Sequence, residues 1–240
     1  MSHWWESTLL RRERVARETV ACVLRRPPGF EFRAGQYVEM MLLSPAFTDA
    51  LGPSRAMSIA SAPSDEEIVI LMRLRDTAFK RSITALSPGE PLLLDGPIDD
   101  LPIGGRTGGA VALLAGGVGV APFRSFLRET AAFGRRLAGT LFYSNRRPED
   151  AAYLDELATL SASIGLQFMP TMTQMATSAR EWPGATERLS GEMVDRCVPR
   201  SCDTRYYVSG STLFVSGLCY DLEQRGVPPR AIAVEMYAGY

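Results

Sequence analysis

The segment of this sequence whose residues point most clearly to a chemical role contains three glycines and a proline. Gly116, Gly117 and Gly119 follow an apolar run, residues 110–115, that predicts a strand buried on both faces. Pro122 comes where an amphipathic segment should begin a helix. Glycines let the backbone approach a ligand, and a helix N-terminus offers free N–H groups and a positive dipole end. The pattern predicts a phosphate-binding turn, and a plain tight connection is the alternative.

A second candidate lies at residues 55–63, where an arginine and two serines interrupt an apolar strand. The guanidinium of Arg55 can bind phosphate oxygens in a fork. Ser58, three residues later, can hydrogen-bond a ring nitrogen. The alternative is an edge strand whose arginine faces solvent.

The composition excludes several classes of chemistry. The 240 residues are 46% hydrophobic with a net charge of −1, which is typical of a soluble globular protein and argues against a nucleic-acid binder. No signal pattern and no apolar stretch of about 20 residues is present, and the four cysteines form no CxxC pair. Free thiols predict a cytoplasmic protein. The only histidine is His3, so we expect no catalytic triad and no histidine-ligated metal within the fold.

The chain divides into two parts that differ in the order of their predicted strands and helices. Residues 11–95 contain short strands and turns, including a loosely alternating segment at residues 14–25, and predict an antiparallel β-barrel. After a glycine-rich connection at residues 104–109, strands alternate with helices, which predicts a doubly wound parallel sheet. The expected architecture is therefore a β-barrel domain, residues 1–105, followed by an α/β domain, residues 106–240.

Together these motifs resemble the ferredoxin–NADP reductase superfamily. Residues 55–58 resemble its Arg-x-Tyr-Ser flavin signature, and residues 116–122 resemble its pyridine-nucleotide turn. Four further segments resemble family elements in the same order: residues 32–37, 76–80, 143–157 and 235–240. The resemblance implies that residues 1–105 bind FAD and that residues 106–240 bind NAD(P)H.

The resemblance also implies a role for each matching position. Ser58 would hydrogen-bond near the flavin N5, and Glu235 and Tyr237 would close the site beside the flavin ring. Arg55 would bind a flavin phosphate. The other cofactor-binding positions are Met57 at the flavin face, Thr77, Ala78 and Phe79 at the pyrophosphate, Gly116, Gly117 and Gly119 at the nicotinamide nucleotide, Ser144 and Arg146 at the ribose, and Thr171 and Thr173 in the nucleotide cleft.

Three positions depart from the family pattern. Met57 replaces a tyrosine that stacks on the flavin, although its sulfur can still pack on an aromatic face. Asp99 stands where the family has a glycine, and a carboxylate there would be unfavourable unless it turned to solvent. Ser209 stands where the family has cysteine or alanine.

These features favour a flavin-dependent oxidoreductase that passes a hydride from NAD(P)H to FAD N5 and electrons to a separate acceptor, a ferredoxin or an oxygenase component. FAD is expected rather than FMN. Arg146 and Arg147 with Ser144 could hold a 2′-phosphate, which slightly favours NADPH over NADH. Three alternatives stay open: a flavin-bearing electron-transfer or regulatory subunit, a free-standing flavin, quinone or ferric reductase, and a nucleotide-binding protein without flavin.

Overall fold

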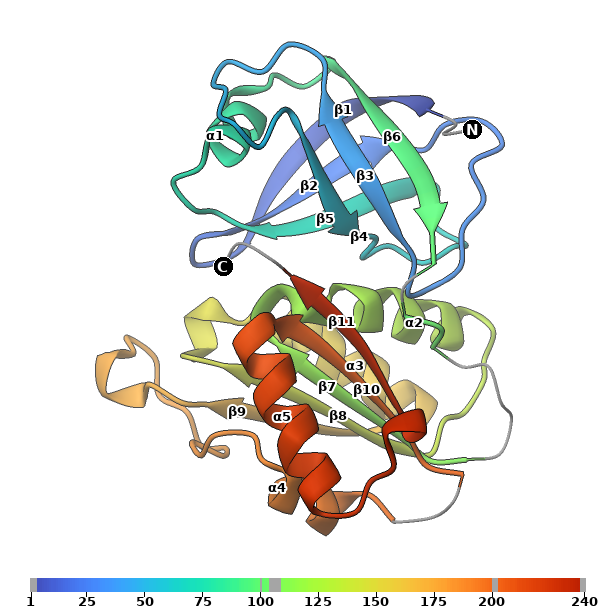
Figure 1. Cartoon of the computed structure of the whole chain (residues 1–240), viewed down its shortest axis with the longest axis vertical. Coiled ribbons are helices and arrows are strands. Elements are labelled where there is room, and N and C mark those ends of the chain that lie inside the picture. The colour runs from blue at the N-terminus through green and yellow to red at the C-terminus, as the bar shows by residue number, and fades with distance from the viewer. Residues whose placement is uncertain (1–3, 100, 104–108, 200–202, 238–240) are drawn as a thin grey trace.

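The chain forms two units, one above the other, in a computed structural model that describes residues 4–99, 101–103, 109–199 and 203–237 (Figure 1). Several sequence-based predictions fall outside the described residues. They concern His3, Cys202, the closing residues 238–240 and the domain boundary between residues 105 and 106. That boundary therefore stays a prediction.

The first unit is an antiparallel barrel, as predicted. Its strands lie in the order β4-β3-β6-β1-β2-β5. The sheet curls until its two ends meet, where Ile59 bridges to Ile70 and the Ala60 N–H donates to the Val69 carbonyl at 2.7 Å. The strands are β1 (Trp4–Ala16), β2 (Thr19–Arg25), β3 (Tyr37–Leu42), β4 (Ser54–Ser58), β5 (Glu67–Arg73) and β6 (Pro91–Ile98).

Alternation of side chains explains how the barrel fills. On β3, Val38, Met40 and Leu42 are buried while their neighbours are half-buried, which is the period-two pattern of a strand with one face inward. These side chains join Leu92 and Leu94 of β6 in one hydrophobic cluster. The cluster fills the barrel.

Two features of this unit were not predicted. The loosely alternating residues 14–25 contain a turn with Glu18 in the left-handed region, φ 51°, which separates β1 from β2. Helix α1 (Ala78–Ala85) begins within the segment 76–80 that resembles a family element. The hydroxyl of Thr77 accepts the Lys80 N–H at 3.3 Å and caps the first turn.

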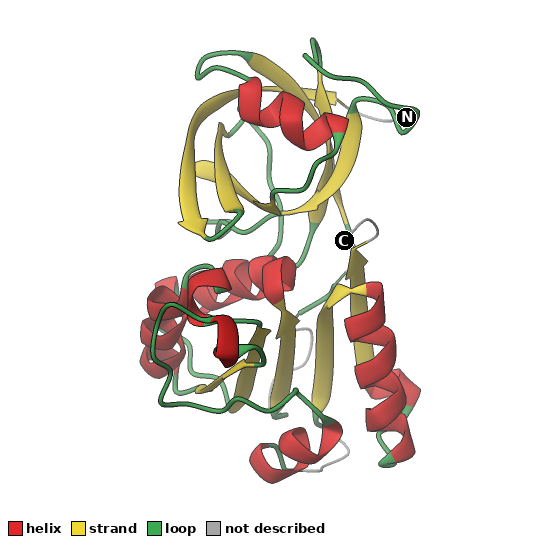
Figure 2. Ribbon diagram, turned by 90° about the vertical axis from the view of Figure 1, so that its left-hand side faces the viewer, coloured by secondary structure: helices red, strands yellow, loops and turns green. Residues whose placement is uncertain are grey.

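The second unit is a doubly wound parallel sheet, as predicted. Its strands lie in the order β11-β10-β7-β8-β9, and every neighbouring pair is parallel. Figure 2 shows these strands between helices on both sides. The elements are β7 (Val111–Gly116), η1 (Gly117–Val120), α2 (Ala121–Ala132), β8 (Gly139–Asn145), η2 (Pro148–Asp150), α3 (Leu154–Ile164), β9 (Gln167–Met172), η3 (Met175–Thr177), α4 (Gly191–Cys197), β10 (Arg205–Ser211), α5 (Thr212–Gln224), η4 (Pro229–Ala231) and β11 (Ile232–Tyr237).

Both faces of this sheet are buried, which is why β7 reads as a continuous apolar run. Leu113 belongs to the cluster that contains Phe123 of α2, whereas its neighbour Leu114 belongs to the cluster that contains Val215 of α5. Among the described residues, none of the helices combines the length and the apolar character that crossing a bilayer requires.

Candidate active site

A cavity of about 450 Å³ lies where the barrel meets the second unit. Strand β4 supplies Met57 and Ser58 to its wall, while Val118 of η1 and Tyr237 of β11 come from the second unit. A larger cavity, about 980 Å³, lies where β7, β10 and β11 begin, and none of the predicted site residues lines it. The smaller cavity is therefore the candidate site.

Three cationic side chains line this cavity: Arg55, Arg73 and Lys80. The Nε atom of Arg73 is buried and has no hydrogen-bond partner. Beside them, the first turn of α1 has N–H groups without acceptors inside the helix. Such a set of donors and positive charges fits a diphosphate. Arg73 is also ion-paired, because its Nη2 atom donates to Glu18 Oε2 at 3.1 Å.

The surroundings of the cavity change the pKa of Lys80. Burial lowers the pKa of the Lys80 ammonium to about 8, and the nearby guanidinium groups of Arg75, Arg55 and Arg73 act in the same direction. An anion bound here would relieve that repulsion, because an opposite charge favours the protonated form.

The wall beside the cations is apolar. Met57, Leu71 and Val118 line the cavity, and the methionine sulfur can pack on an aromatic face. Phe79 is only 2% exposed and belongs to the barrel core, with the Arg55 guanidinium 5.2 Å from its ring centroid. A flat ring system with a phosphorylated tail matches a cavity that is lined by both apolar and cationic side chains.

At the junction of the two units, four side chains form one hydrogen-bond network. The Ser58 hydroxyl donates to Glu235 Oε1 at 2.5 Å and lies 2.6 Å from the Tyr237 hydroxyl. The hydroxyls of Tyr237 and Ser209 both donate to Glu235 Oε2, each at 2.9 Å. The structure thus brings Ser58, Glu235 and Tyr237 together.

Ser209 was missed as a site residue by sequence reasoning, which treated it only as a departure from the family. Its position follows from sheet register, because Ser209 of β10 is paired with Glu235 of β11. Glu235 is 3% exposed, and Ser209 is fully buried. The serine at this position therefore serves the buried carboxyl group, whose oxygens need donors once water is removed.

Arg55 already has partners in this structure. Its guanidinium donates to the Gly52 carbonyl at 2.9 Å and to the Leu51 carbonyl at 3.1 Å, and it lies 3.4 Å from Asp49. These bonds hold residues 49–54 against the edge of the cavity. The guanidinium is therefore fixed in place at the cavity before any ligand arrives.

The glycines of the turn after β7 serve different purposes. Gly117 adopts φ +56° and faces open space, so it provides the left-handed turn. A side chain at Gly119 would lie 2.3 Å from the Ser209 carbonyl oxygen, so this glycine lets η1 pack on β10. A Cβ at Gly116 would press on the Phe214 ring at 2.9 Å. Pro122 lies in the first turn of α2, as predicted.

The predicted ribose-binding positions lie at the ends of β8 and β9. Ser144 is half-buried, and Arg146 is exposed with no side-chain hydrogen bond or ion pair to the rest of the described chain. Arg147 is instead paired with Asp150 at 2.7 Å. The buried Asn145 Nδ2 lacks a partner, which leaves a donor for a ligand at this edge.

The hydroxyls of Thr171 and Thr173 both donate hydrogen bonds to backbone carbonyls. Thr171 is fully buried, and its hydroxyl donates to the Glu187 carbonyl, so its side chain does not face a cleft. Thr173 is exposed, and its hydroxyl donates to the Asn145 carbonyl at 3.3 Å. Of the two, only Thr173 presents its side chain to solvent.

Asp99 resolves the conflict that the sequence posed. Its carboxylate accepts hydrogen bonds from Arg33 at 2.8 Å and from Gln36 at 2.7 Å, and its side chain is 72% exposed. The bonds from Gln36 and Arg33 lower the pKa of Asp99. The negative charge is thus turned to solvent and paired.

The chain resembles known oxidoreductases in sequence. Residues 113–219 match the family model of the oxidoreductase NAD-binding domain. The chain is 28% identical over 211 residues to the reductase component of propane 2-monooxygenase from Gordonia sp. (strain TY-5), covering 84% of this chain and 58% of that protein. It is also 28% identical over 216 residues to ferredoxin–NADP reductase B from Sorangium cellulosum, covering 87% and 86% of the two chains.

The solved structures agree. A ferredoxin NADP⁺ reductase from Neisseria gonorrhoeae, with bound FAD and NADP, superposes with a TM-score of 0.80 and 23% identity over 97% of this chain and 98% of that one. This chain has the fold of the ferredoxin–NADP reductases. It spans 58% of the length of the first curated relatives that it matches.

The likeness to the ferredoxin NADP⁺ reductase structure confirms the predicted fold. The barrel comes first, the NAD-binding unit second, and the network of Ser58, Glu235 and Tyr237 lies where they meet. The turn at Gly116–Gly119 lies within the matched NAD-binding domain.

Proposed function

We propose that this chain is an NAD(P)H-dependent flavoprotein reductase that binds FAD, transfers a hydride to it and sends the electrons to a separate acceptor. The observation that carries the proposal is the network in which Ser58 of the barrel and Glu235, Tyr237 and Ser209 of the NAD-binding unit share hydrogen bonds at the mouth of a cation-lined cavity. It supports a reaction that needs two ligands, one held by each unit.

A flavin bound in the cavity would supply the hydride-accepting atom and the capacity to release electrons singly. The protein supplies orientation and electrostatics. Ser58 presents its hydroxyl from the end of β4, and Glu235 and Tyr237 fix that hydroxyl from the other unit. Glu235 and Tyr237 are also hydrogen-bonded to each other, so the Ser58 hydroxyl has little freedom to rotate away from a ligand.

The donor set supports FAD over FMN. Arg55, Arg73, Lys80 and the first turn of α1 offer more positive charge than a single phosphate needs, and together they suit a pyrophosphate. Chromatography of the cofactor released from the purified protein tests this point. FAD is the expected result, and FMN alone would refute it.

The arrangement at β8 limits how a 2′-phosphate could be held. Arg147 is committed to Asp150, so the exposed Arg146 is the guanidinium available at this edge. A preference for NADPH therefore depends on Arg146. Rates with both nucleotides, in wild type and Arg146→Ala, test it, and an NADH preference that survives the substitution would end the proposal.

We infer that the electron acceptor is a redox protein, either an oxygenase component or a ferredoxin. The relatives named as a propane 2-monooxygenase reductase component and as a ferredoxin–NADP reductase support this choice. Steady-state turnover with protein acceptors and with free flavin, quinone or ferric chelates separates the proposal from a free-standing reductase. Reduction of the small acceptors with no gain from any redox protein would contradict it.

A cytoplasmic location is also proposed. Cys22, Cys197 and Cys219 are unpaired among the described residues, which is common where thiols stay reduced. Fractionation of the native cells with immunodetection tests this location.

A further inference from the structure

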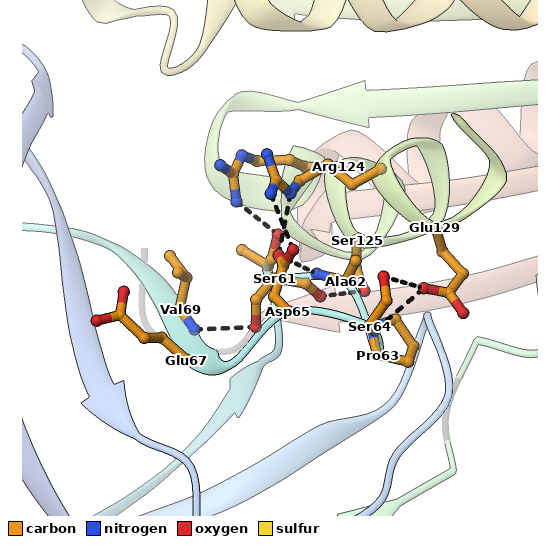
Figure 3. Close-up of polar contacts among 12 residues, drawn as sticks. Ser61, Ala62, Pro63, Ser64, Asp65, Glu67, Val69, Arg124, Ser125 and Glu129 are labelled. Carbon is orange, nitrogen blue, oxygen red and sulfur yellow. Dashed lines mark hydrogen bonds and ion pairs between the residues drawn. The ribbon is translucent and has the colours of Figure 1, made fainter. Parts of the chain in front are cut away.

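The two units touch along a second line, away from the network at Ser58. Residues 60–65 follow β4, and helix α2 lies against them (Figure 3). The Arg124 guanidinium donates to the Ala60 carbonyl at 2.7 Å, and the Ser125 hydroxyl donates to the Ser61 carbonyl at 2.6 Å. Arg124 is 7% exposed and Ser125 fully buried, so both bonds are shielded from water.

One turn further along α2, Arg128 continues the contact. Its Nε and Nη2 atoms donate to the two carboxylate oxygens of Asp65 at 3.0 and 2.9 Å, a bidentate ion pair. Asp65 also accepts the Ala62 N–H at 2.8 Å, which fixes the shape of the segment. Burial raises the pKa of Asp65, but the bonds from Arg128 and Ala62 outweigh it and hold that pKa below its usual range.

A carboxylate of the second unit fixes both arginines. Glu156 of α3 lies 3.0 Å from Arg124 and 3.0 Å from Arg128. The Arg124 guanidinium also lies 4.0 Å from the centroid of the Tyr153 ring. These contacts within the NAD-binding unit therefore orient the side chains of Arg124 and Arg128 toward the barrel.

The position of this contact along the chain gives it a consequence for the site. Ala60 lies two residues after Ser58, and Arg124 lies five residues after Gly119. Each end of the contact is thus attached, through a short rigid segment, to one of the two proposed ligand sites. A shift of α2 against residues 60–65 would move the glycine turn relative to Ser58.

We propose that Arg124, Ser125 and Arg128 with residues 60–65 form an interdomain clasp that sets the spacing between the flavin site and the nucleotide site, with Arg124 as its principal positioning residue. This inference rests on the proposed reductase function. Hydride transfer depends steeply on approach, since a displacement of about 1 Å can cost about 100-fold in rate. A loosened clasp therefore slows transfer while each unit still binds its own ligand.

The test compares Arg124→Lys, which keeps the charge and loses the fork, with Arg124→Ala and Ser125→Ala. Leu127→Ala is the matched control, because Leu127 is buried on the same helix and shares a hydrophobic cluster with Ala60, but its side chain makes no hydrogen bond to residues 60–65. We expect flavin content and nucleotide dissociation constants within about twofold of wild type for the clasp variants. The rate of anaerobic flavin reduction at saturating nucleotide falls by about 10- to 100-fold in Arg124→Ala. It falls less in Arg124→Lys and Ser125→Ala.

Hydrogen exchange gives a second readout that needs no turnover. In Arg124→Ala, residues 59–69 and 121–132 lose protection together, whereas Leu127→Ala loosens residues 121–132 alone. Dithionite reduces the flavin of every variant at the wild-type rate, because it bypasses the nucleotide site. If Arg124→Ala is less stable but reduces its flavin as fast as wild type, the clasp is only structural and the proposal is overturned.

The outcome also distinguishes this inference from the proposed function. If nucleotide fails to reduce flavin in the wild type, the reductase function is wrong, and no spacing for hydride transfer is left to propose. If wild type is reduced and Arg124→Ala binds both ligands yet is reduced slowly, the clasp is supported. Arg124→Lys is the more conservative variant and keeps the test open if Arg124→Ala does not fold.

Discussion

Ser58 and Glu235 lie 177 positions apart in the sequence, yet the Ser58 hydroxyl donates to the Glu235 carboxyl at 2.5 Å. The bond joins the last residue of a barrel strand to the last strand of the parallel sheet. Ser58 belongs to the barrel and the buried Glu235 to the second unit, so this hydrogen bond forms only where the two units meet. Docking of the units and assembly of the site are thus the same event.

Ser58→Ala tests the hydroxyl at the centre of this network. A hydrogen bond to a charged group contributes roughly 1.5–3 kcal/mol, or about 10- to 150-fold. We expect flavin reduction by nucleotide to slow by about 10- to 100-fold, with flavin content unchanged, as measured by anaerobic stopped-flow absorbance. Ser54→Ala, on the same strand and lining the same cavity, is the control. Equal rates for both variants would remove Ser58 from the mechanism.

Arg55→Ala tests the flavin phosphate site. The loss of one charged hydrogen-bonding group should weaken FAD binding by about 10- to 150-fold. Flavin fluorescence, followed while FAD is titrated into the apoprotein, measures the affinity. Asp49→Asn controls for the ion pair that Arg55 also makes, and it should leave the affinity unchanged. An Arg55→Ala protein that retains full flavin absorbance would show that the guanidinium only braces residues 49–54.

Lys80 predicts a pH dependence of flavin binding. Its pKa of about 8 in the ligand-free chain lies below the ordinary lysine value of 10.5, so between these values the unfolded chain binds more protons than the folded one. The stability of the apoprotein should therefore rise with pH across this window. An anionic diphosphate raises the pKa of Lys80, so FAD affinity should fall as pH rises above about 8.

Two substitutions check this sign. Lys80→Met should bind FAD more weakly at pH 7 and lose the pH dependence, whereas Lys80→Arg should keep the affinity and also lose the dependence. Titrations of apoprotein with FAD and thermal unfolding across the same pH range provide the measurements. A wild-type affinity that rises with pH in this window would contradict the assigned role.

The glycine turn predicts losses of stability of different size at Gly117 and Gly119. Gly117→Ala meets open space but a left-handed backbone, so it should cost about 1 kcal/mol of stability and weaken nucleotide binding. In Gly119→Ala the new Cβ would lie 2.3 Å from the Ser209 carbonyl, so unfolding should occur at a much lower temperature. Calorimetry and nucleotide titration separate the two, and equal stabilities would count against the close packing of η1 on β10.

The sequence predicted the fold because the fold depends on local patterns, whereas Ser58, Glu235 and Tyr237 became candidates through the resemblance to a family. Period-two alternation at Val38, Met40 and Leu42 and the run before Gly116 reflect burial of one face or both. The hairpin turn at Glu18 and helix α1 were missed, because short elements carry little periodicity. The Thr77 cap was the available signal for α1.

Other features depend on register and packing, which no local pattern reveals. Ser209 joins the site because β10 and β11 are paired at that residue. The burial of Thr171 and the pairing of Arg147 with Asp150 remove two side chains from the predicted nucleotide edge. The solvent-facing pair of Asp99 with Arg33 likewise required the fold.

The most direct test of the central claim is an absorbance spectrum of the FAD-loaded protein under strictly anaerobic conditions, before and after addition of NADPH or NADH. The reductase proposal predicts bleaching of the flavin band by at least one nucleotide, at a rate that depends on Ser58, followed by return of the band when an electron acceptor is added. A flavin band that dithionite bleaches but neither nucleotide changes would contradict the proposal and favour an electron-transfer or regulatory subunit.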